Sequence, residues 1–252
     1  VTARATHRNA RAVTARPLDR PARESLAARA ALAARRTLLL DYDGTLREIV
    51  EHPSLAQPTP EILDLLAGLA ALPDTEVHIV SGRVAEDLDA WFGGLPVSLC
   101  AEHGYRVRAA GESGWRARED VDLSWLPCVE RLLERVSAEV PGTHVERKAG
   151  GVAWHYRRAD QEYAEWRARE LLVAVEQLLH GVAAEVLRGH RVIEVRARGV
   201  NKGAYVATLF PPGRLRPHER FVLSAGDDAT DVDVTAAVPP RREERRHVRA
   251  LV

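Results

Sequence analysis

The sequence of 252 residues predicts an α/β protein that carries a smaller inserted α+β unit. Three observations lead to this fold class. Apolar segments alternate with helical patterns over residues 37–101 and again from Asn201, which is typical of a parallel sheet with both faces covered. Polar residues gather where the apolar segments end, the edge at which open α/β sheets bind ligands. Between residues 124 and 197 the order changes to helices and strand pairs.

The first part of the chain predicts an N-terminal arm followed by the start of the core. Residues 1–34 are rich in Arg and Ala, and we expect an arm that ends in a helix over 22–34. The run TLLLDYDGTL, residues 37–46, predicts a buried strand that stops at two aspartates. The elements expected next are a helix that begins at Thr59-Pro60, a strand over 76–80, a helix over 84–91 and a strand over 97–101.

The second part of the chain predicts the insert and then a return to the core. The elements expected in the insert are a helix over 126–139, strands over 144–148 and 152–157 around Gly150-Gly151, a helix over 160–180, and strands over 184–187 and 192–196. A helix over 202–209, a strand over 221–224 and a turn over 225–233 are expected to follow. The domains we expect are the arm over 1–34, a discontinuous core over 35–123 and 198–252, and an inserted α+β domain over 124–197.

The composition argues against several classes of protein. Lys plus Arg and Asp plus Glu number 36 each, so charge predicts neither nucleic acid nor a membrane as a partner. The two cysteines, Cys100 and Cys128, make neither a disulfide framework nor a zinc spacing, which fits a reducing compartment. Without a membrane-length apolar run or a signal-peptide pattern, we expect a cytoplasmic protein. Because the chain starts at Val1 and has no Met, we expect an alternative start codon or a cut from a longer polypeptide.

The end of the first strand carries the pattern that points to chemistry. Asp41 and Asp43 lie two apart on an extended segment, so both side chains can point the same way. Together they suit a hard cation, or the roles of nucleophile and acid. Taken alone the pair is a weak signal, because a turn or a helix cap also explains it. Gly44 permits a tight turn, and Thr45 can offer its hydroxyl and N–H to an anion.

Three later segment ends supply matching groups. Ser81 offers a small hydroxyl to a phosphoryl oxygen, and Lys202 offers a positive charge. Asp227-Asp228 and Asp231 add oxygen ligands for Mg²⁺, which prefers carboxylates together with phosphate. Each group alone has a structural explanation, a turn for Ser81 and a solvated helix start for Lys202. Their occurrence in order at the ends of successive segments predicts a phosphate and metal site.

These segments resemble the motifs of a known enzyme family. DYDGTL, VSGR, NKG and GDDATD are similar to the four motifs of the haloacid-dehalogenase-like (HAD-like) phosphatases. Five further segments resemble the trehalose-6-phosphate phosphatases, namely AEHG at 101–104, ERK at 146–148, AWHYR at 153–157, VIEVR at 192–196 and GVNKG at 199–203. The resemblance covers about residues 36–235. It implies a HAD-like Rossmann-type core with a parallel sheet and an inserted α+β cap.

The resemblance also implies a reaction, the Mg²⁺-dependent hydrolysis of trehalose 6-phosphate through an aspartyl-phosphate. It makes Asp41 the nucleophile and Asp43 the acid that protonates the sugar oxygen and later the base. The metal ligands implied are Asp41, the carbonyl of Asp43 and Asp227, supported by Asp228 or Asp231. The phosphate-binding residues implied are Thr45, Ser81 and Lys202, and the sugar-binding residues implied are His103, Glu146, Lys148, Arg157, Glu194 and Asn201.

Several alternatives stay open. The substrate can instead be another glycosyl phosphate, such as sucrose, glucosylglycerol or mannosylglycerate phosphate, or the chain can be a non-catalytic sugar-phosphate-binding module of a synthase. The resemblance extends to phosphatase domains fused behind trehalose-phosphate synthase, which implies an association with that enzyme. We expect Arg83 and Glu102 to buttress loops, whereas His155 and Tyr156 suit packing and function equally. The charge-dense segment after Val238 predicts an exposed tail instead of a strand.

Overall fold

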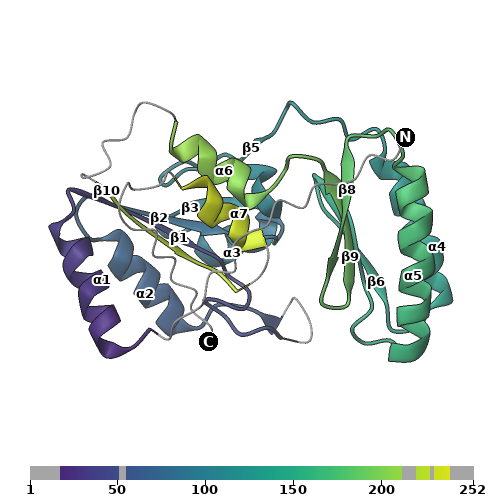
Figure 1. The fold of residues 1–252 in the computed structure, drawn as a ribbon, viewed down its shortest axis with the longest axis horizontal. Helices are drawn as coiled ribbons and strands as arrows, with labels where there is room; N and C mark the ends of the chain where they lie inside the picture. The colour runs from purple at the N-terminus through teal and green to yellow at the C-terminus, as the bar shows by residue number, and fades with distance from the viewer. Residues whose placement is uncertain (1–17, 51–54, 212–219, 228–229, 239–252) are drawn as a thin grey trace, which may run out of the picture.

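The computed structural model describes residues 18–50, 55–211, 220–227 and 230–238, and it confirms the predicted fold class (Figure 1). A mostly parallel sheet, here called the core sheet, lies beside a separate antiparallel sheet, here called the insert sheet. In this described part of the chain, no helix has both the length and the apolar character that crossing a membrane requires. The arm up to residue 17, the tail from 239 and Asp228 lie outside the described residues.

The core sheet has six strands in the order β10-β1-β2-β3-β4-β5, of which the first four are parallel. Its strands are β1 (Arg35–Leu40), β2 (Thr75–Val80), β3 (Ser98–Ala101), β4 (Arg106–Arg108), β5 (Arg116–Ala117) and β10 (Arg220–Ala225). The sequence did not predict β4 and β5, because segments of three and two residues are too short to show an alternation.

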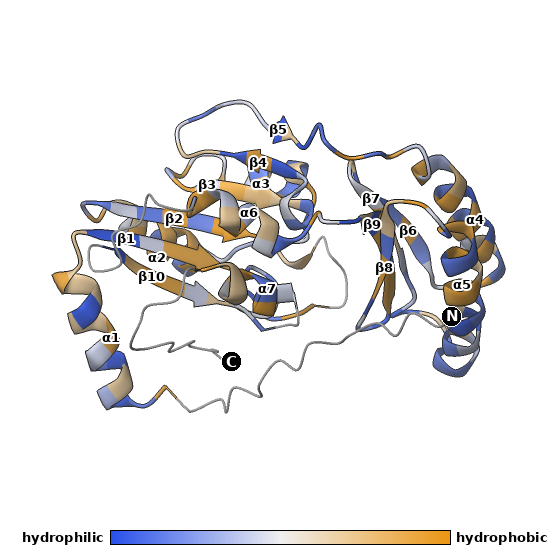
Figure 2. Ribbon diagram, turned by 45° about the horizontal axis from the view of Figure 1, so that its top comes forward, coloured by the Kyte–Doolittle hydropathy of each residue, from blue (hydrophilic) through white to orange (hydrophobic). Residues whose placement is uncertain are grey.

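Helices cover both faces of the core sheet. They are α1 (Arg20–Leu32), α2 (Pro60–Ala70), α3 (Ala85–Phe92), α6 (Lys202–Leu209) and α7 (Thr230–Ala237). Leu38 and Leu40 pack in one apolar cluster with α2 and α3, whereas Leu39 packs in a second cluster with α6 and α7. Because successive side chains of a strand point to opposite faces, a strand buried on both sides must be continuously apolar. Figure 2 shows the second half of β1, where these leucines lie, in orange.

The turn expected over residues 225–233 is wrong in its second half, where α7 begins at Thr230. Thr and Asp are common both in turns and at the start of helices, so this local composition did not separate the two structures. The consequence concerns Asp231, which lies in the first turn of a helix and not on a loop.

The insert contains four antiparallel strands in the order β6-β7-β9-β8 and two helices. Its elements are α4 (Leu126–Glu139), β6 (His144–Arg147), β7 (Gly151–His155), α5 (Gln161–Leu178), β8 (Ala184–Gly189) and β9 (Val192–Ala197). α4 and α5 cover the side of the sheet away from the core (Figure 1).

Strand alternation gives the insert sheet two different faces. Trp154 and Ile193 are fully buried in the cluster formed with α4 and α5. Glu146, Ala153 and Glu194 are in register across β6, β7 and β9, one step out of phase with those apolar residues. They therefore lie on the opposite face, which is turned toward the core. The small side chain of Ala153 separates the two carboxylates.

Candidate active site

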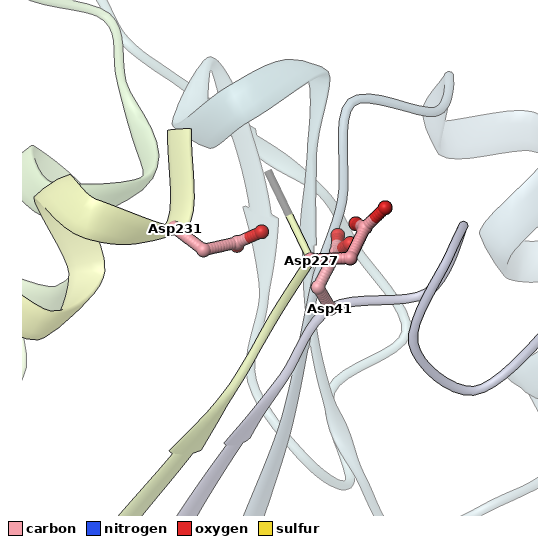
Figure 3. Close-up of side chains that lie close together, drawn as sticks. All are labelled: Asp41, Asp227 and Asp231. Atoms are coloured by element: carbon pink, nitrogen blue, oxygen red, sulfur yellow. The ribbon is translucent and has the colours of Figure 1, made fainter. Parts of the chain in front are cut away.

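Three carboxylates meet at the carboxyl edge of the core sheet. Asp41 follows β1, Asp227 follows β10, and Asp231 lies in the first turn of α7. One oxygen atom of each lies within 4.8 Å of the others. Figure 3 shows the side chain of Asp231 reaching from α7 toward the ends of the two strands. Since β1 and β10 are parallel neighbours, their ends must meet, as the sequence predicted for Asp41 and Asp227.

Lys202 brings a positive charge into this acidic cluster. Its Nζ lies 2.6 Å from Oδ1 of Asp41 and 2.9 Å from Oδ1 of Asp231, and all three side chains are buried. Burial raises the pKa of Asp41 to about 7, and Lys202 opposes that rise. One ammonium group among three carboxylates leaves an excess of negative charge. The atoms that could ligate a metal ion here are all carboxylate oxygens. Such a donor set fits a hard divalent cation.

The turn after Asp41 needs a glycine for two reasons. Gly44 has a φ of 81°, a conformation that side chains disfavour. A Cβ on Gly44 would also lie 2.0 Å from Oδ2 of Asp227. The glycine thus lets the β1 turn approach the acidic cluster. In the next position, the buried hydroxyl of Thr45 finds no hydrogen-bond partner among the described residues, as suits a group that serves a ligand.

Asp43 is held by an arginine. Arg83 donates from Nε to Oδ2 of Asp43 at 2.9 Å and from Nη2 to Oδ1 at 2.7 Å, a two-point contact. From the sequence, Arg83 was expected only to support a loop. The VSGR segment placed Arg83 near the site, yet nothing in it identified Asp43, forty positions away, as the partner.

Ser81 follows β2, beside β1 in the sheet. It is buried, and its Oγ accepts a hydrogen bond from the backbone N–H of Arg83 at 3.2 Å. Its carbonyl accepts from the N–H of His103 at 3.0 Å. A Cβ on Gly82 would lie 2.5 Å from Nε2 of His103, so any side chain at this position would have to displace the imidazole ring. Ser81 and His103 thus occupy adjoining loops at one edge.

Three of the predicted sugar-binding residues form one network between the two sheets. Lys148 Nζ lies 2.9 Å from Oε1 of Glu194 and 3.0 Å from the carbonyl oxygen of Gly82 in the core. His103 Nε2 lies 3.4 Å from the other carboxylate oxygen of Glu194. Burial alone would raise the pKa of Glu194, but Lys148 and His103 outweigh burial and hold it well below its usual value. Glu194 is therefore an ionised hydrogen-bond acceptor.

Glu146 is held by a residue of the neighbouring strand. Its Oε2 lies 2.7 Å from Nε2 of His155, and the His155 ring stacks on His144 with centroids 4.7 Å apart. Tyr156 instead lies in the apolar core of the insert, stacked on Trp154. Of the two residues left open by the sequence, His155 faces the acidic row and Tyr156 packs.

Two other predicted sugar-binding residues make backbone contacts. Arg157 donates from Nη1 to the carbonyl of Val50 at 2.7 Å, which links the insert to the core. The side chain of Asn201 accepts from the N–H of Ala204 at 2.7 Å and caps α6. The cap places Lys202 in the first turn of that helix, directed at Asp41. Neither residue is joined to the Lys148 network by a described contact.

Glu102 forms a third link between insert and core. Its Oε2 accepts from the N–H of Gly150 at 2.8 Å, in the turn between β6 and β7, and burial raises its pKa. Glu102 and His103 both have positive φ, 50° and 57°, which is costly for residues other than glycine. Such strain is common at functional sites, and only the backbone angles reveal it.

Comparison with known proteins gives a consistent result. The trehalose-phosphatase family model matches residues 39–250, which extends past residue 235, where the motif resemblance ends. A bifunctional trehalose-6-phosphate synthase/phosphatase of Thermoproteus tenax is 44% identical over 209 residues, which are 83% of this chain and 28% of that protein. A trehalose-phosphatase of Saccharomyces cerevisiae is 37% identical over 220 residues, 80% of this chain and 25% of that protein.

A solved structure agrees with these sequences. The trehalose-6-phosphate phosphatase C-terminal domain of Candida albicans superposes with a TM-score of 0.79 at 32% identity, covering 85% of this chain and 78% of that domain. The chain spans only between 25% and 28% of the length of the two curated relatives named above. The likeness therefore concerns one portion of those longer proteins.

Proposed function

The chain belongs to the trehalose-phosphatase family, and from this premise we propose that it hydrolyses trehalose 6-phosphate to trehalose and phosphate. The observation that carries the proposal is the position of Asp41. Its carboxylate is buried at the end of β1 beside Lys202 and two further acids, and the polar face of the insert sheet reaches the neighbouring loop through Lys148. In this proposal the nucleophile Asp41 lies next to Lys202, which binds phosphate, and faces the polar side of the insert sheet, whose groups suit a polyol.

The proposed reaction has two steps that use the same two acids. Asp41 attacks phosphorus, the bond from phosphorus to the sugar oxygen breaks, and Asp43 gives its proton to that oxygen. Asp43 then takes a proton from a water molecule that attacks phosphorus, and the bond to Asp41 breaks. A sugar alkoxide leaves poorly, and a positioned proton donor is worth about 10²–10⁴-fold in rate.

The phosphoryl oxygens are held by groups from three elements. Lys202 supplies a charge from α6, Ser81 a hydroxyl after β2, and Thr45 a hydroxyl and an N–H after β1. Asp41, Asp227, Asp231 and the carbonyl of Asp43 would hold Mg²⁺, and Asp228 lies outside the described residues. When bound, the ion supplies positive charge that offsets the repulsion between an anionic nucleophile and a phosphate dianion.

The unit over 124–197 is proposed to act as the cap that recognises the sugar. Glu146, Lys148, Glu194 and His103 offer hydrogen-bonding groups matched to hydroxyls, with Arg157 and Asn201 at the margin of the site. The core would then comprise residues 35–123 and 198–252. The two separate sheets support this division, and Tyr105 and Val200 from the core stretches pack into the apolar cluster of the insert.

The family relationship suggests a partner for this chain. The relative in Thermoproteus tenax is named as both synthase and phosphatase, so we propose that this chain works joined to, or beside, a trehalose-phosphate synthase. The cytoplasm remains our prediction from the sequence.

The deciding experiment is phosphate release with Mg²⁺ from trehalose 6-phosphate, beside a panel of sucrose, glucosylglycerol, mannosylglycerate and glucose phosphates. We expect the highest kcat/KM for trehalose 6-phosphate. A clear preference for another glycosyl phosphate would reassign the substrate. No turnover of any of them by a folded protein, with trehalose 6-phosphate still bound, would indicate the non-catalytic module.

A further inference from the structure

Arg83 is the residue that fixes Asp43. We propose that Arg83 is a positioning residue for proton transfer, which holds the carboxylate of Asp43 in the orientation that serves the leaving oxygen and then the water. The inference rests on the proposed function, in which Asp43 is the acid and base. It concerns a different residue and needs its own test.

The contact between the two side chains sets the orientation of the carboxylate. The guanidinium places Nε and Nη2 on the two oxygens of Asp43, at 2.9 and 2.7 Å. Two parallel hydrogen bonds fix the plane of a carboxylate, whereas a single one leaves it free to rotate. Each oxygen keeps a second lone pair outside the fork, so Asp43 can still exchange a proton with a substrate.

Arg83 is itself held before any substrate binds. Its guanidinium carbon lies 4.9 Å from the ring centroid of Trp91 and 5.9 Å from that of Tyr42. The Tyr42 and Trp91 rings are 5.3 Å apart, and the Tyr42 hydroxyl donates to the carbonyl of Ala56 at 2.5 Å. Asp87, in the first turn of α3, lies 3.5 Å from Nη1 of Arg83. This support is anchored on both the β1 turn and α3.

The two side chains of the pair differ in how deeply they are buried. The Arg83 side chain is 10% exposed, whereas that of Asp43 is 36% exposed. The arginine is therefore the fixed partner, and the aspartate is the partner with access to the space above the sheet edge. A lysine at this position could keep the ion pair with Asp43. It has no planar guanidinium with two parallel donors, so it could not fix the plane of the Asp43 carboxylate.

Two substrates with different leaving groups can distinguish whether Arg83 positions Asp43 or only supports the structure. Release of a sugar needs the proton from Asp43, whereas p-nitrophenolate leaves without one. In the Arg83→Gln variant we expect kcat on trehalose 6-phosphate to fall about 10- to 100-fold. The pre-steady-state burst of p-nitrophenolate from p-nitrophenyl phosphate should change less than about 3-fold, because that step needs no general acid. Arg83→Lys should show an intermediate loss.

The chain offers a matched control in Arg106. It also pairs with α3, through Glu86 at 2.6 Å, and lies 5.6 Å from the centroid of Trp115. Arg106→Gln thus removes an equivalent ion pair and ring contact outside the site, and both rates should stay at the wild-type level. If Arg83→Gln does not fold, Trp91→Leu keeps the arginine but removes part of its support, and it should lower the same rate selectively.

The outcomes are distinct. Equal losses in the burst and in sugar-phosphate turnover, or no loss in either, would overturn the proposal. If wild-type protein turned over no phosphate ester, the proposed function would fail, and crystal structures would decide the role of Arg83. There we expect one orientation of Asp43 in the wild type and several in Arg83→Gln or Trp91→Leu. The same single orientation in wild type and variant would show that Arg83 does not position Asp43.

Discussion

The ammonium of Lys202 lies between the carboxylates of Asp41 and Asp231, 2.6 and 2.9 Å away, in a buried cluster. Gly203 makes this arrangement possible, because a Cβ there would lie 2.6 Å from the carbonyl oxygen of Asp233 on α7. The first turns of α6 and α7 can therefore pack against each other and aim Lys202 and Asp231 at the end of β1. The NKG segment thus combines a cap, a charge and a close helix contact.

Replacing Asp41 by Asn should abolish turnover and leave binding intact. The amide cannot attack phosphorus, so we expect kcat to fall at least about 10⁴-fold. The lost negative charge removes repulsion of the phosphate, so affinity should be equal or higher. Phosphate release and calorimetric binding of trehalose 6-phosphate measure the two effects. Asp64→Asn, exposed on α2, is the control. Near-normal turnover by the Asp41→Asn variant would exclude Asp41 as the nucleophile.

Removal of divalent metal should stop the reaction, and Asp227 should set the metal requirement. We expect chelation to abolish phosphate release and Mg²⁺ to restore it. Asp227→Asn should raise the half-saturating Mg²⁺ concentration about 10-fold or more, because it removes a charged oxygen ligand. Calorimetric titration of Mg²⁺ checks the affinity without turnover. Asp64→Asn, exposed on α2 away from the site, should behave as wild type. Unchanged Mg²⁺ affinity in Asp227→Asn would contradict the ligand assignment.

Glu146 should contribute to sugar recognition without affecting the phosphate chemistry. Loss of a hydrogen bond to a charged group costs about 1.5–3 kcal/mol, so Glu146→Gln should raise KM for trehalose 6-phosphate about 10-fold or more. The burst with p-nitrophenyl phosphate, which has no sugar, should be unchanged. Glu185→Gln removes a charge from β8 that pairs with Arg196 at 2.8 Å and serves as the control. A KM for Glu146→Gln equal to that of the control would remove Glu146 from the sugar site.

His78 should make the fold sensitive to acid. It lies in β2, with Nδ1 2.8 Å from the hydroxyl of Tyr205, and burial lowers its pKa from 6.5 to about 4. The unfolded chain binds a proton that the folded state refuses, so the free energy of unfolding falls as pH drops from 6.5 toward 4. The loss should be about 2 kcal/mol between about pH 7.5 and pH 5.

Urea unfolding at both pH values, in wild type and His78→Gln, measures this contribution. The variant has no titrating imidazole, so its loss of stability on acidification should be smaller by about that amount. Parallel pH dependence in the two proteins would show that His78 is not responsible.

Patterns contained within a single element were predicted well. The helices expected over 126–139 and 202–209 have those bounds in the structure, because their signals are local: Pro127 and an apolar face for the first, and the cap by Asn201 for the second. The run TLLL predicted a strand buried on both faces, and Leu38, Leu39 and Leu40 are buried between two clusters. Asp41 and Asp227 could also be brought together in advance, since the ends of parallel strands meet at one edge.

The tertiary structure decided which groups each side chain touches. Asp43 is paired with Arg83, Glu146 with His155, and Glu102 with the turn at Gly150. Arg157 and Asn201 were expected to bind sugar, and the structure gives both a backbone contact. Most of these partners lie on different strands, helices or loops. The contact of Asn201 instead depends on the backbone geometry at the start of α6. Local periodicity sets the faces of an element, but only the packing of one element on another selects the atoms that meet.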